Sequence, residues 1–119
     1  MAVIRPFPAV RPACAYAESV ISLPYDVMDR EEAGRMALDN PYSFLRISRS
    51  EIDLPDLGDP YDPAVYAKAK ANLDDFLNRG ILLRDPKPMF YIYAQVMDGR
   101  IQTGLVACAS IDDYLNNVI

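Results

Sequence analysis

The chain of 119 residues contains no histidine. Histidine is the side chain whose ordinary pKa lies nearest neutrality, and it supplies the base in Ser-His and Cys-His nucleophile systems. It is also a common zinc ligand. These residues therefore cannot form a complete active site of either nucleophile type, a histidine-bearing zinc site or an imidazole general base.

Glycine and positive charge are also scarce. The five glycines form neither the G-x-G-x-x-G pattern nor a phosphate-binding loop. Lysine and arginine number 12 against 17 acids, giving a net charge of −5, and no basic run interleaves with aromatic residues. Because nucleic-acid backbones attract positive charge, we expect no direct binding of DNA or RNA.

Long hydrophobic runs are missing as well. The longest uncharged apolar stretch, 101 to 111, is about half of the ~20 residues that a membrane-spanning helix needs. An arginine and two prolines interrupt the first eight residues, which is unlike a signal peptide. Without secretory features, Cys14 and Cys108 are expected to be buried thiols in a reducing cytoplasm rather than a disulfide pair. We therefore expect a cytoplasmic protein that contacts no membrane.

The composition that remains is that of a globular protein, with 51% hydrophobic and 24% charged residues. A chain of this length suits one domain with its own core, so residues 1–119 are taken as a single domain. Residues 112–119 end on apolar side chains without a helix cap or polar tail. We expect the chain to be the amino-terminal module of a longer protein, with the rest of that protein as its partner.

Two helices are predicted from their capping residues. Asp29 can cap a helix that runs from 29 to 39. Asp62 precedes Pro63 at the first position of a helix from 63 to 79. The apolar stripe of this second helix consists of Tyr66, Ala69, Leu73, Phe76 and Leu77.

Extended segments are predicted around these helices. Short strands are expected near 3–4, 20–21 and 42–47, the last from its alternating pattern. Residues 89–111 read as a β-hairpin around Asp98-Gly99, the dipeptide preferred in tight type I′ turns. We predict an α+β fold in which the two helices pack on one side of a mainly antiparallel sheet that contains this C-terminal hairpin.

The hairpin register assigns each side chain to a face. One face is apolar and is expected to meet the core: Phe90, Ile92, Ala94, Val96, Ile101, Thr103, Leu105 and Ala107. The opposite face is mixed, and something else can dock there: Tyr91, Tyr93, Gln95, Met97, Arg100, Gln102, Gly104 and Val106.

An acidic loop from 51 to 62 carries aspartates at intervals of three: Asp53, Asp56, Asp59 and Asp62. It departs from a calcium-binding EF-hand, because Pro55 and Leu57 stand where oxygen ligands are needed and no glutamate closes the loop. We therefore predict a solvated loop and no metal site.

Two segments, 23–27 and 40–46, each bring a proline, a tyrosine hydroxyl and a small polar group to the end of a predicted element. Loops on a rigid scaffold often present binding groups in this way. The predicted ligand-binding residues are Tyr25, Asp26, Asn40, Tyr42, Ser43 and Arg46. The alternative is that the prolines set turns and the tyrosines fill the core.

Four arginines lie in the non-helical first half of the chain: Arg5, Arg11, Arg46 and Arg49. If they converge, they can bind a carboxylate or phosphate in forked geometry. If they are scattered, they only balance neighbouring acids. Neither catalytic residues nor a cofactor can be named from the sequence.

Several spaced segments together resemble the domain of unknown function 1015 family: 5–7 (Arg-Pro-Phe), 23–27, 40–45, 59–63 and 102–107. The resemblance implies a longer parent with a His-Glu pair and an Asp-Gly-His-His-Arg segment downstream. The latter is similar to a segment of chromosome-partitioning ParB proteins and free-serine kinases. None of these motifs occurs here, so no catalytic residue transfers to this chain.

Two functions follow as expectations. The chain is one wall of a nucleotide or phosphoryl-transfer site completed by downstream residues, or it is a non-catalytic module that docks the rest of its parent or a partner. A DNA-partitioning adaptor rests on analogy alone, and the acidic charge argues against it.

Overall fold

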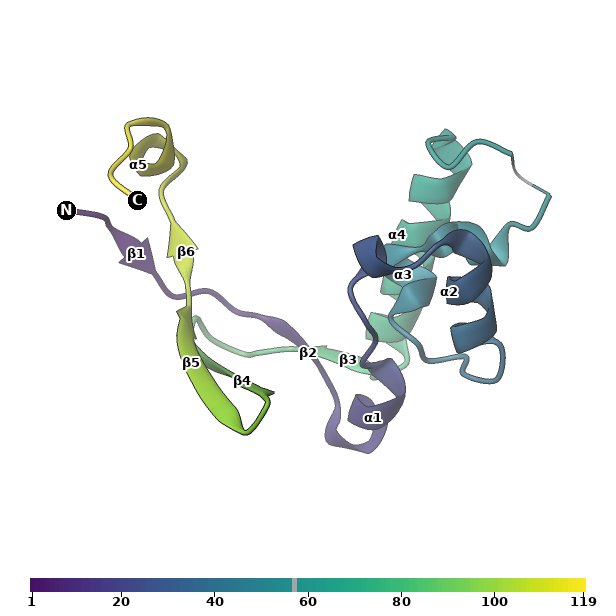
Figure 1. The fold of residues 1–119 in the computed structure, drawn as a ribbon, viewed down its shortest axis with the longest axis horizontal. Coiled ribbons are helices and arrows are strands. Elements are labelled where there is room, and N and C mark those ends of the chain that lie inside the picture. Colours follow the sequence, from purple (N-terminus) through teal and green to yellow (C-terminus); the bar gives the residue numbers. More distant parts are fainter. Residues whose placement is uncertain (57) are drawn as a thin grey trace. The chain divides into compact units, whose positions relative to one another are not determined.

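The computed structural model describes residues 1–56 and 58–119, which form two compact units (Figure 1). Unit 1 comprises Met1–Val10 and Arg84–Ile119, and unit 2 comprises Arg11–Leu83. The helices and antiparallel strands of these units confirm the predicted α+β class. Leu57, named above as an unsuitable metal ligand, lies outside the described residues.

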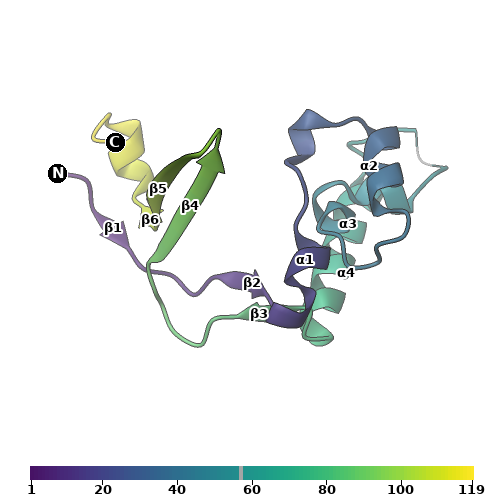
Figure 2. The same ribbon diagram turned by 60° about the horizontal axis from the view of Figure 1, so that its bottom comes forward.

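Unit 2 is built from helices. Its α-helices are α1 (Ala17–Val20), α2 (Arg30–Ala37), α3 (Leu45–Ser48) and α4 (Pro63–Asn78). Three short 3₁₀ segments connect them: η1 (Cys14–Tyr16), η2 (Tyr25–Val27) and η3 (Ser50–Asp53). Helices α2, α3 and α4 lie together in this unit (Figure 2).

Both predicted helices are confirmed, together with the caps that define them. The Asp29 carboxylate accepts the backbone N–H of Glu32 at 2.8 Å, and Asp62 accepts that of Ala64 at 2.8 Å. Each cap satisfies a backbone donor that the first helical turn leaves without a partner. The caps therefore place the start of α2 and of α4.

The end of α4 is fixed by Gly80, whose φ of 71° lies in the left-handed region. The N–H of Ile81 reaches the carbonyl of Phe76 at 2.9 Å, and the N–H of Gly80 reaches that of Leu77 at 3.2 Å. This pair of bonds is a Schellman motif. It turns the chain so that Ile81, only 1% exposed, enters the core.

The core of unit 2 is small. A cluster of buried side chains joins α2 to α3 and packs against Ile52, and its members are Met28, Ala33, Ala37 and Leu45. Val65 and Phe76 are buried on α4. Because α2 contributes two alanines, α3 can approach it closely.

The predicted strand at 42–47 is wrong, because this segment is a turn followed by α3. The side-chain oxygen of Asn40 accepts the N–H of Tyr42 at 3.1 Å, and the hydroxyl of Ser43 accepts that of Leu45 at 3.2 Å. Such local bonds give the backbone an alternative to strand pairing. They outweigh the alternating pattern of the sequence.

The strand predicted near Val20 and Ile21 is also wrong. Val20 ends α1, which the alanine-rich segment before it favours. Its side chain is 3% exposed, and its carbonyl accepts the N–H of Phe44 at 2.9 Å. The residue therefore anchors α1 to the turn before α3.

Unit 1 is mainly antiparallel. Strand β1 (Ile4–Arg5) pairs with β6 (Cys108–Ala109), and β4 (Tyr91–Met97) pairs with β5 (Arg100–Val106). Strands β2 (Val10–Pro12) and β3 (Leu82–Arg84) pair as well, and the boundary between the units falls within both. Helix α5 (Ile111–Leu115) follows β6 and starts at Ser110.

The predicted hairpin is confirmed for residues 91–106, with the register expected from the sequence. Its predicted continuation to residue 111 is wrong, because Cys108 and Ala109 pair with β1 and Ile111 begins α5. Val96 lies opposite Ile101, and Met97 lies opposite Arg100. Asp98 and Gly99 have φ values of 52° and 75°, both positive as a type I′ turn requires. The expectation drawn from the Asp-Gly dipeptide therefore holds.

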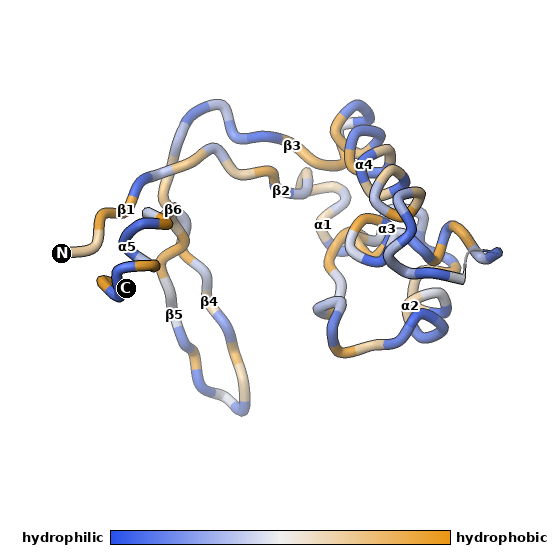
Figure 3. Tube along the Cα trace, turned by 90° about the horizontal axis from the view of Figure 1, so that it is seen from above, coloured by the Kyte–Doolittle hydropathy of each residue, from blue (hydrophilic) through white to orange (hydrophobic). Residues whose placement is uncertain are grey.

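The expected burial of the apolar hairpin face is wrong. Its large side chains are all exposed: Ile92 at 72%, Val96 at 67%, Ile101 at 71% and Leu105 at 56%. Orange hydrophobic stretches alternate with paler or blue ones along both strands (Figure 3). The two strands pair only with each other among the described residues, so nothing in unit 1 covers this face.

Two further expectations concern membranes and thiols. Among the described residues, no helix is long and apolar enough to cross a bilayer. Cys14 and Cys108 are free thiols, as expected, but both are exposed rather than buried. Cys108 lies on the two-residue strand β6, both of whose residues are exposed. The predicted packing of the helices on the hairpin stays a prediction, since they belong to different units.

Replacing Gly99 by valine is expected to destabilise the hairpin by about 1 kcal/mol or more, because a β-branched residue is strained at positive φ. No atom lies within 4 Å of the added Cβ, so the cost comes from the backbone and not from a clash. Hydrogen exchange of the β4 and β5 amides measures it.

Gly104→Val is the matched control, because its Cβ meets only the Tyr93 carbonyl at 4.0 Å and its φ is not positive. Equal exchange rates in the Gly99→Val and Gly104→Val variants would show that the turn does not depend on glycine.

Candidate functional site

Four of the predicted ligand-binding residues lie close together: Asn40, Tyr42 and Ser43 in the turn between α2 and α3, and Arg46 in the first turn of α3. The side chain of Arg46 bonds to this turn and to the end of α2. Its Nε donates to the carbonyl of Asn40 at 3.2 Å, its Nη2 donates to that of Ala37 at 2.7 Å, and its Nη1 pairs with Asp53 at 2.5 Å. The guanidinium therefore holds the end of α2, where helix carbonyls lack partners and attract cations.

Asn72 of α4 completes this network. Its side-chain amide donates to the carbonyl of Arg46 at 2.6 Å and to the second oxygen of Asp53 at 3.0 Å. One ion pair and one amide thus link α2, α3, η3 and α4. For Arg46, the structure agrees with the interpretation in which arginines balance nearby acids.

The other polar groups of this turn also have partners. The amide nitrogen of Asn40 donates to the carbonyl of Ser19 at 2.6 Å. Ser43 is 3% exposed, and its hydroxyl accepts a hydrogen bond from a backbone N–H. These side chains therefore hold the backbone of the turn in place.

Tyr42 is half-buried between two neighbours. Its ring meets that of Tyr16 edge-on, with centroids 5.0 Å apart, and the Arg79 guanidinium lies 5.5 Å from its centroid. A hydrogen bond to Asp75 raises the pKa of Arg79, and Tyr42 contributes in the same direction. Arg79 thus remains a cation for its contact with the aromatic ring.

Tyr25 and Asp26 lie apart from that turn, on η2. Tyr25 lines a cavity of unit 2 with a volume of about 480 Å³. The aromatic and charged residues that share the lining are Tyr61, Tyr66, Arg30, Arg49 and Glu51. The structure therefore separates the six predicted residues into two places.

An ion pair lies in the lining of this cavity. Arg49 Nε is 3.0 Å from Glu51 Oε1, and the two side chains are 21% and 10% exposed. The same Nε is buried and has no hydrogen bond, because its N–H is not aligned with that carboxylate. The pair is thus electrostatic, and it leaves hydrogen-bonding capacity on the guanidinium.

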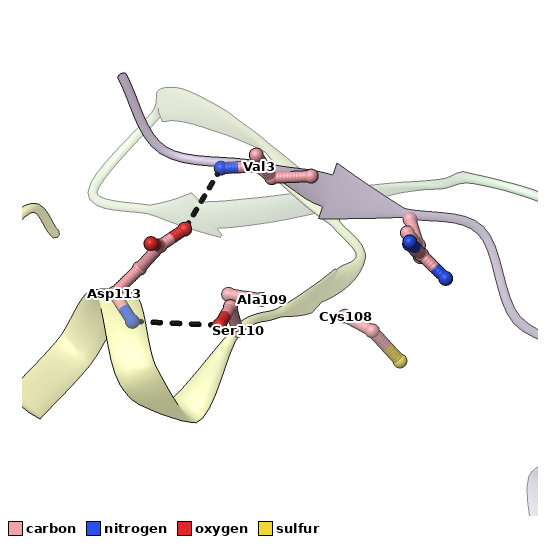
Figure 4. Close-up of a pocket in the computed structure, with 6 residues that line it drawn as sticks. Val3, Cys108, Ala109, Ser110 and Asp113 are labelled. Carbon is pink, nitrogen blue, oxygen red and sulfur yellow. Dashed lines mark hydrogen bonds between the residues drawn. The ribbon is translucent and has the colours of Figure 1, made fainter.

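A second cavity, of about 380 Å³, lies in unit 1 between β1 and the start of α5 (Figure 4). Asp113 accepts the backbone N–H of Val3 at 3.0 Å, and its own N–H points to the Ser110 hydroxyl at 3.4 Å. Arg5 and Cys108 lie opposite each other across the β1–β6 pair. The carboxylate of this cavity is already used to fasten β1.

Metal binding has no support in the part of the chain that the structure describes, where no group of three or more cysteine or acidic residues could hold an ion. The acidic loop contributes instead to folding. Asp53 pairs with Arg46, Asp59 accepts the N–H of Tyr61 at 2.9 Å, and Asp62 caps α4.

Sequence reasoning missed two features. Asn72 carried a signal, since it is a polar residue that lies between Ala69 and Phe76 on the apolar side of the 63–79 helix. No local sequence pattern indicated that Tyr25, Tyr61 and Tyr66 line one cavity, because Tyr25 is far from the other two in the chain.

The described residues thus form a helical unit and a β unit that offer hydroxyl, carboxylate and guanidinium groups for binding. The chain belongs to the family described as Protein of unknown function (DUF1015), whose model matches residues 4–119. This match confirms the resemblance read from the sequence. No curated protein and no solved structure matches the chain, and the similarity to ParB proteins and free-serine kinases stays a prediction.

Arg46→Ala is expected to lower the free energy of unfolding of unit 2 by about 2 kcal/mol or more, because it removes the ion pair of the largely buried Asp53 and the hydrogen bonds to the carbonyls of Ala37 and Asn40. Urea unfolding followed by circular dichroism measures the loss. Arg35→Ala is the control, since the Arg35–Glu31 pair is 64% and 83% exposed and is worth about 0.5 kcal/mol or less. Equal losses in the two variants would contradict the role given to Arg46.

Proposed function

We propose that this chain is an interaction module whose hairpin, β4 and β5, docks a further segment of the parent polypeptide. The observation that supports the proposal is the exposure of the apolar face, with Ile92 at 72% and Ile101 at 71%. Contiguous exposed apolar surface marks interaction sites, and an isolated two-stranded hairpin is marginally stable in water. A segment that covered this face would bury the exposed apolar surface and stabilise the hairpin.

The size of the hairpin indicates which kind of partner covers it. Each strand has seven residues, so one face measures about 24 Å by about 10 Å, given a rise of ~3.4 Å per residue and a spacing of ~4.8 Å between strands. That area of ~240 Å² is far below the ~800 Å² that each partner contributes to a stable interface. A separate protein would bind it weakly.

A covalently tethered segment can bind this small area stably, because the tether supplies an effective concentration in the millimolar range. The partner is therefore another part of the same polypeptide. This argument favours the parent chain over an independent protein or a second copy.

The hairpin edges add a second mode of contact. Among the described residues β4 and β5 pair only with each other, so each has one edge of unpaired backbone groups. Neither strand contains proline or lysine, the residues that commonly block strand addition. A docking segment can therefore add a strand at an edge and cover the apolar face.

Ile101→Asp is expected to destabilise the parent polypeptide by about 2 kcal/mol or more, because docking would bury an unpaired carboxylate. In the 119-residue chain the same change is expected to cost about 0.5 kcal/mol or less, since Ile101 is 71% exposed. Thermal unfolding of both proteins measures the difference. Gln102→Asp, on the opposite face of the same strand, is the matched control.

If Ile101→Asp is as mild in the parent as in the 119-residue chain, the apolar face is not the docking surface. The proposal then fails even if the parent binds a ligand elsewhere.

The second candidate is that the chain forms one wall of a nucleotide or phosphoryl-transfer site. The cavity of unit 2 favours it, because two arginines and three tyrosines line that cavity. Guanidinium groups suit phosphate, and tyrosine rings suit a base. The chain has no histidine, so a general base of that kind would come from outside these residues.

Calorimetry with a nucleoside diphosphate tests this second candidate. We expect millimolar or weaker binding by the 119-residue chain and appreciably tighter binding by the parent. Tyr25→Ala in the parent is expected to weaken this binding, because Tyr25 is a predicted ligand-binding residue that lines the cavity. Unchanged affinity in the folded variant would exclude Tyr25 from the wall.

A further inference from the structure

The cavity of unit 2 combines features that the docking proposal does not use. Its volume of about 480 Å³ lies within the range of small-molecule sites. Three of its lining residues are tyrosines with largely exposed side chains: Tyr25 at 60%, Tyr61 at 77% and Tyr66 at 59%. Large aromatic side chains gathered at a concave surface are typical of binding sites.

The charge of the lining is opposite to that of the chain. Arg30 and Arg49 against Glu51 give a formal charge of +1, whereas the whole protein carries −5. Arg30 donates to the backbone carbonyls of Glu51 and Leu54, at 3.3 and 2.6 Å. This arginine therefore holds the loop in place, and Arg49 is the better candidate for contact with a ligand.

Arg49 has unused hydrogen-bonding capacity. A guanidinium carries five N–H donors, and Glu51 lies against Arg49 Nε without an aligned hydrogen bond. No hydrogen bond from its Nη groups is found among the described residues. The side chain is 21% exposed, so a ligand in the cavity can reach it while most of the group stays out of bulk water.

We propose that this cavity binds a small organic anion, whose carboxylate or phosphate pairs with Arg49 and whose flat ring packs against the tyrosine side chains. The guanidinium matches either oxyanion in forked geometry. The tyrosines offer apolar faces to the ring and hydroxyls to its polar edge. This site would bind its ligand even if the hairpin docked nothing.

The test is an NMR titration of the 119-residue chain with four probes: phenyl phosphate, benzoate, inorganic phosphate and benzyl alcohol. We expect phenyl phosphate or benzoate to shift the amides of the cavity lining. The probe without a ring and the probe without a charge are expected to bind at least tenfold more weakly. Tighter binding of phenyl phosphate identifies phosphate as the anionic group of the natural ligand, and tighter binding of benzoate identifies carboxylate.

Two variants assign the binding to the proposed groups. Tyr61→Ser removes a ring that is 77% exposed, so it is expected to leave the fold intact and to weaken binding at least fivefold. Arg49→Gln together with Glu51→Gln removes both charges, which avoids an unpaired buried carboxylate, and is expected to weaken binding at least tenfold. Tyr93→Ser, on the hairpin and 61% exposed, is the control and is expected to change nothing.

The inference is overturned if no probe shifts the lining amides at millimolar concentration, if inorganic phosphate binds as tightly as phenyl phosphate, or if Tyr61→Ser binds as tightly as the original chain. Should the double variant fail to fold, Tyr66→Ser replaces it, with the same expected fivefold loss. Adenosine monophosphate separates this inference from the nucleotide candidate. If benzoate binds and adenosine monophosphate does not, the proposed anion site is supported and the proposed nucleotide site is contradicted.

Discussion

The ion pair between Arg46 and Asp53 is the interaction on which unit 2 depends. A single guanidinium ties together the end of α2, the start of α3 and η3, and Asn72 extends the same network to α4. The apolar core of this unit is small and rests partly on alanines, so hydrogen bonds and charge supply much of its specificity. The same network fixes the backbone that leads to Arg49 and the cavity.

Unit 1 is held together in a different way. Strand pairing and the Asp113 contact to Val3 provide its order, while large apolar side chains on β4 and β5 remain exposed. A hairpin of this kind gains little from burial, and its backbone pairing alone gives marginal stability. The two units therefore differ: unit 2 has its own core, whereas the apolar hairpin face of unit 1 is exposed in the part of the chain that the structure describes.

The sequence predicted those features that local chemistry determines. Asp29, Asp62 and the Asp98-Gly99 turn act within a few residues of themselves, so both helices and the hairpin register followed from them. The strand predicted at 42–47 was wrong, because hydrogen bonds to the side chains of Asn40 and Ser43 favour a turn over the extended structure that the alternating pattern indicated.

Contacts between segments far apart in the chain could not be predicted from local sequence patterns. The tyrosine-lined cavity and the link from Asn72 to Asp53 bring together groups many residues apart. Burial of the hairpin face was expected from its pattern, but a pattern shows that a surface needs a partner without showing where the partner lies. The proposed ligand residues Asn40, Ser43 and Arg46 proved to have extensive bonds to backbone and neighbouring groups, which the sequence could not reveal.

The most direct test of the docking account is amide hydrogen exchange of β4 and β5 in two proteins, the 119-residue chain and the parent polypeptide. The account predicts fast exchange of these amides in the 119-residue chain, close to that of a freely opening hairpin, while the amides of α4 exchange slowly. In the parent, the β4 and β5 amides should be protected at least a hundredfold more strongly. Equal protection of the hairpin in the two proteins would contradict the claim that it docks a further segment of its parent.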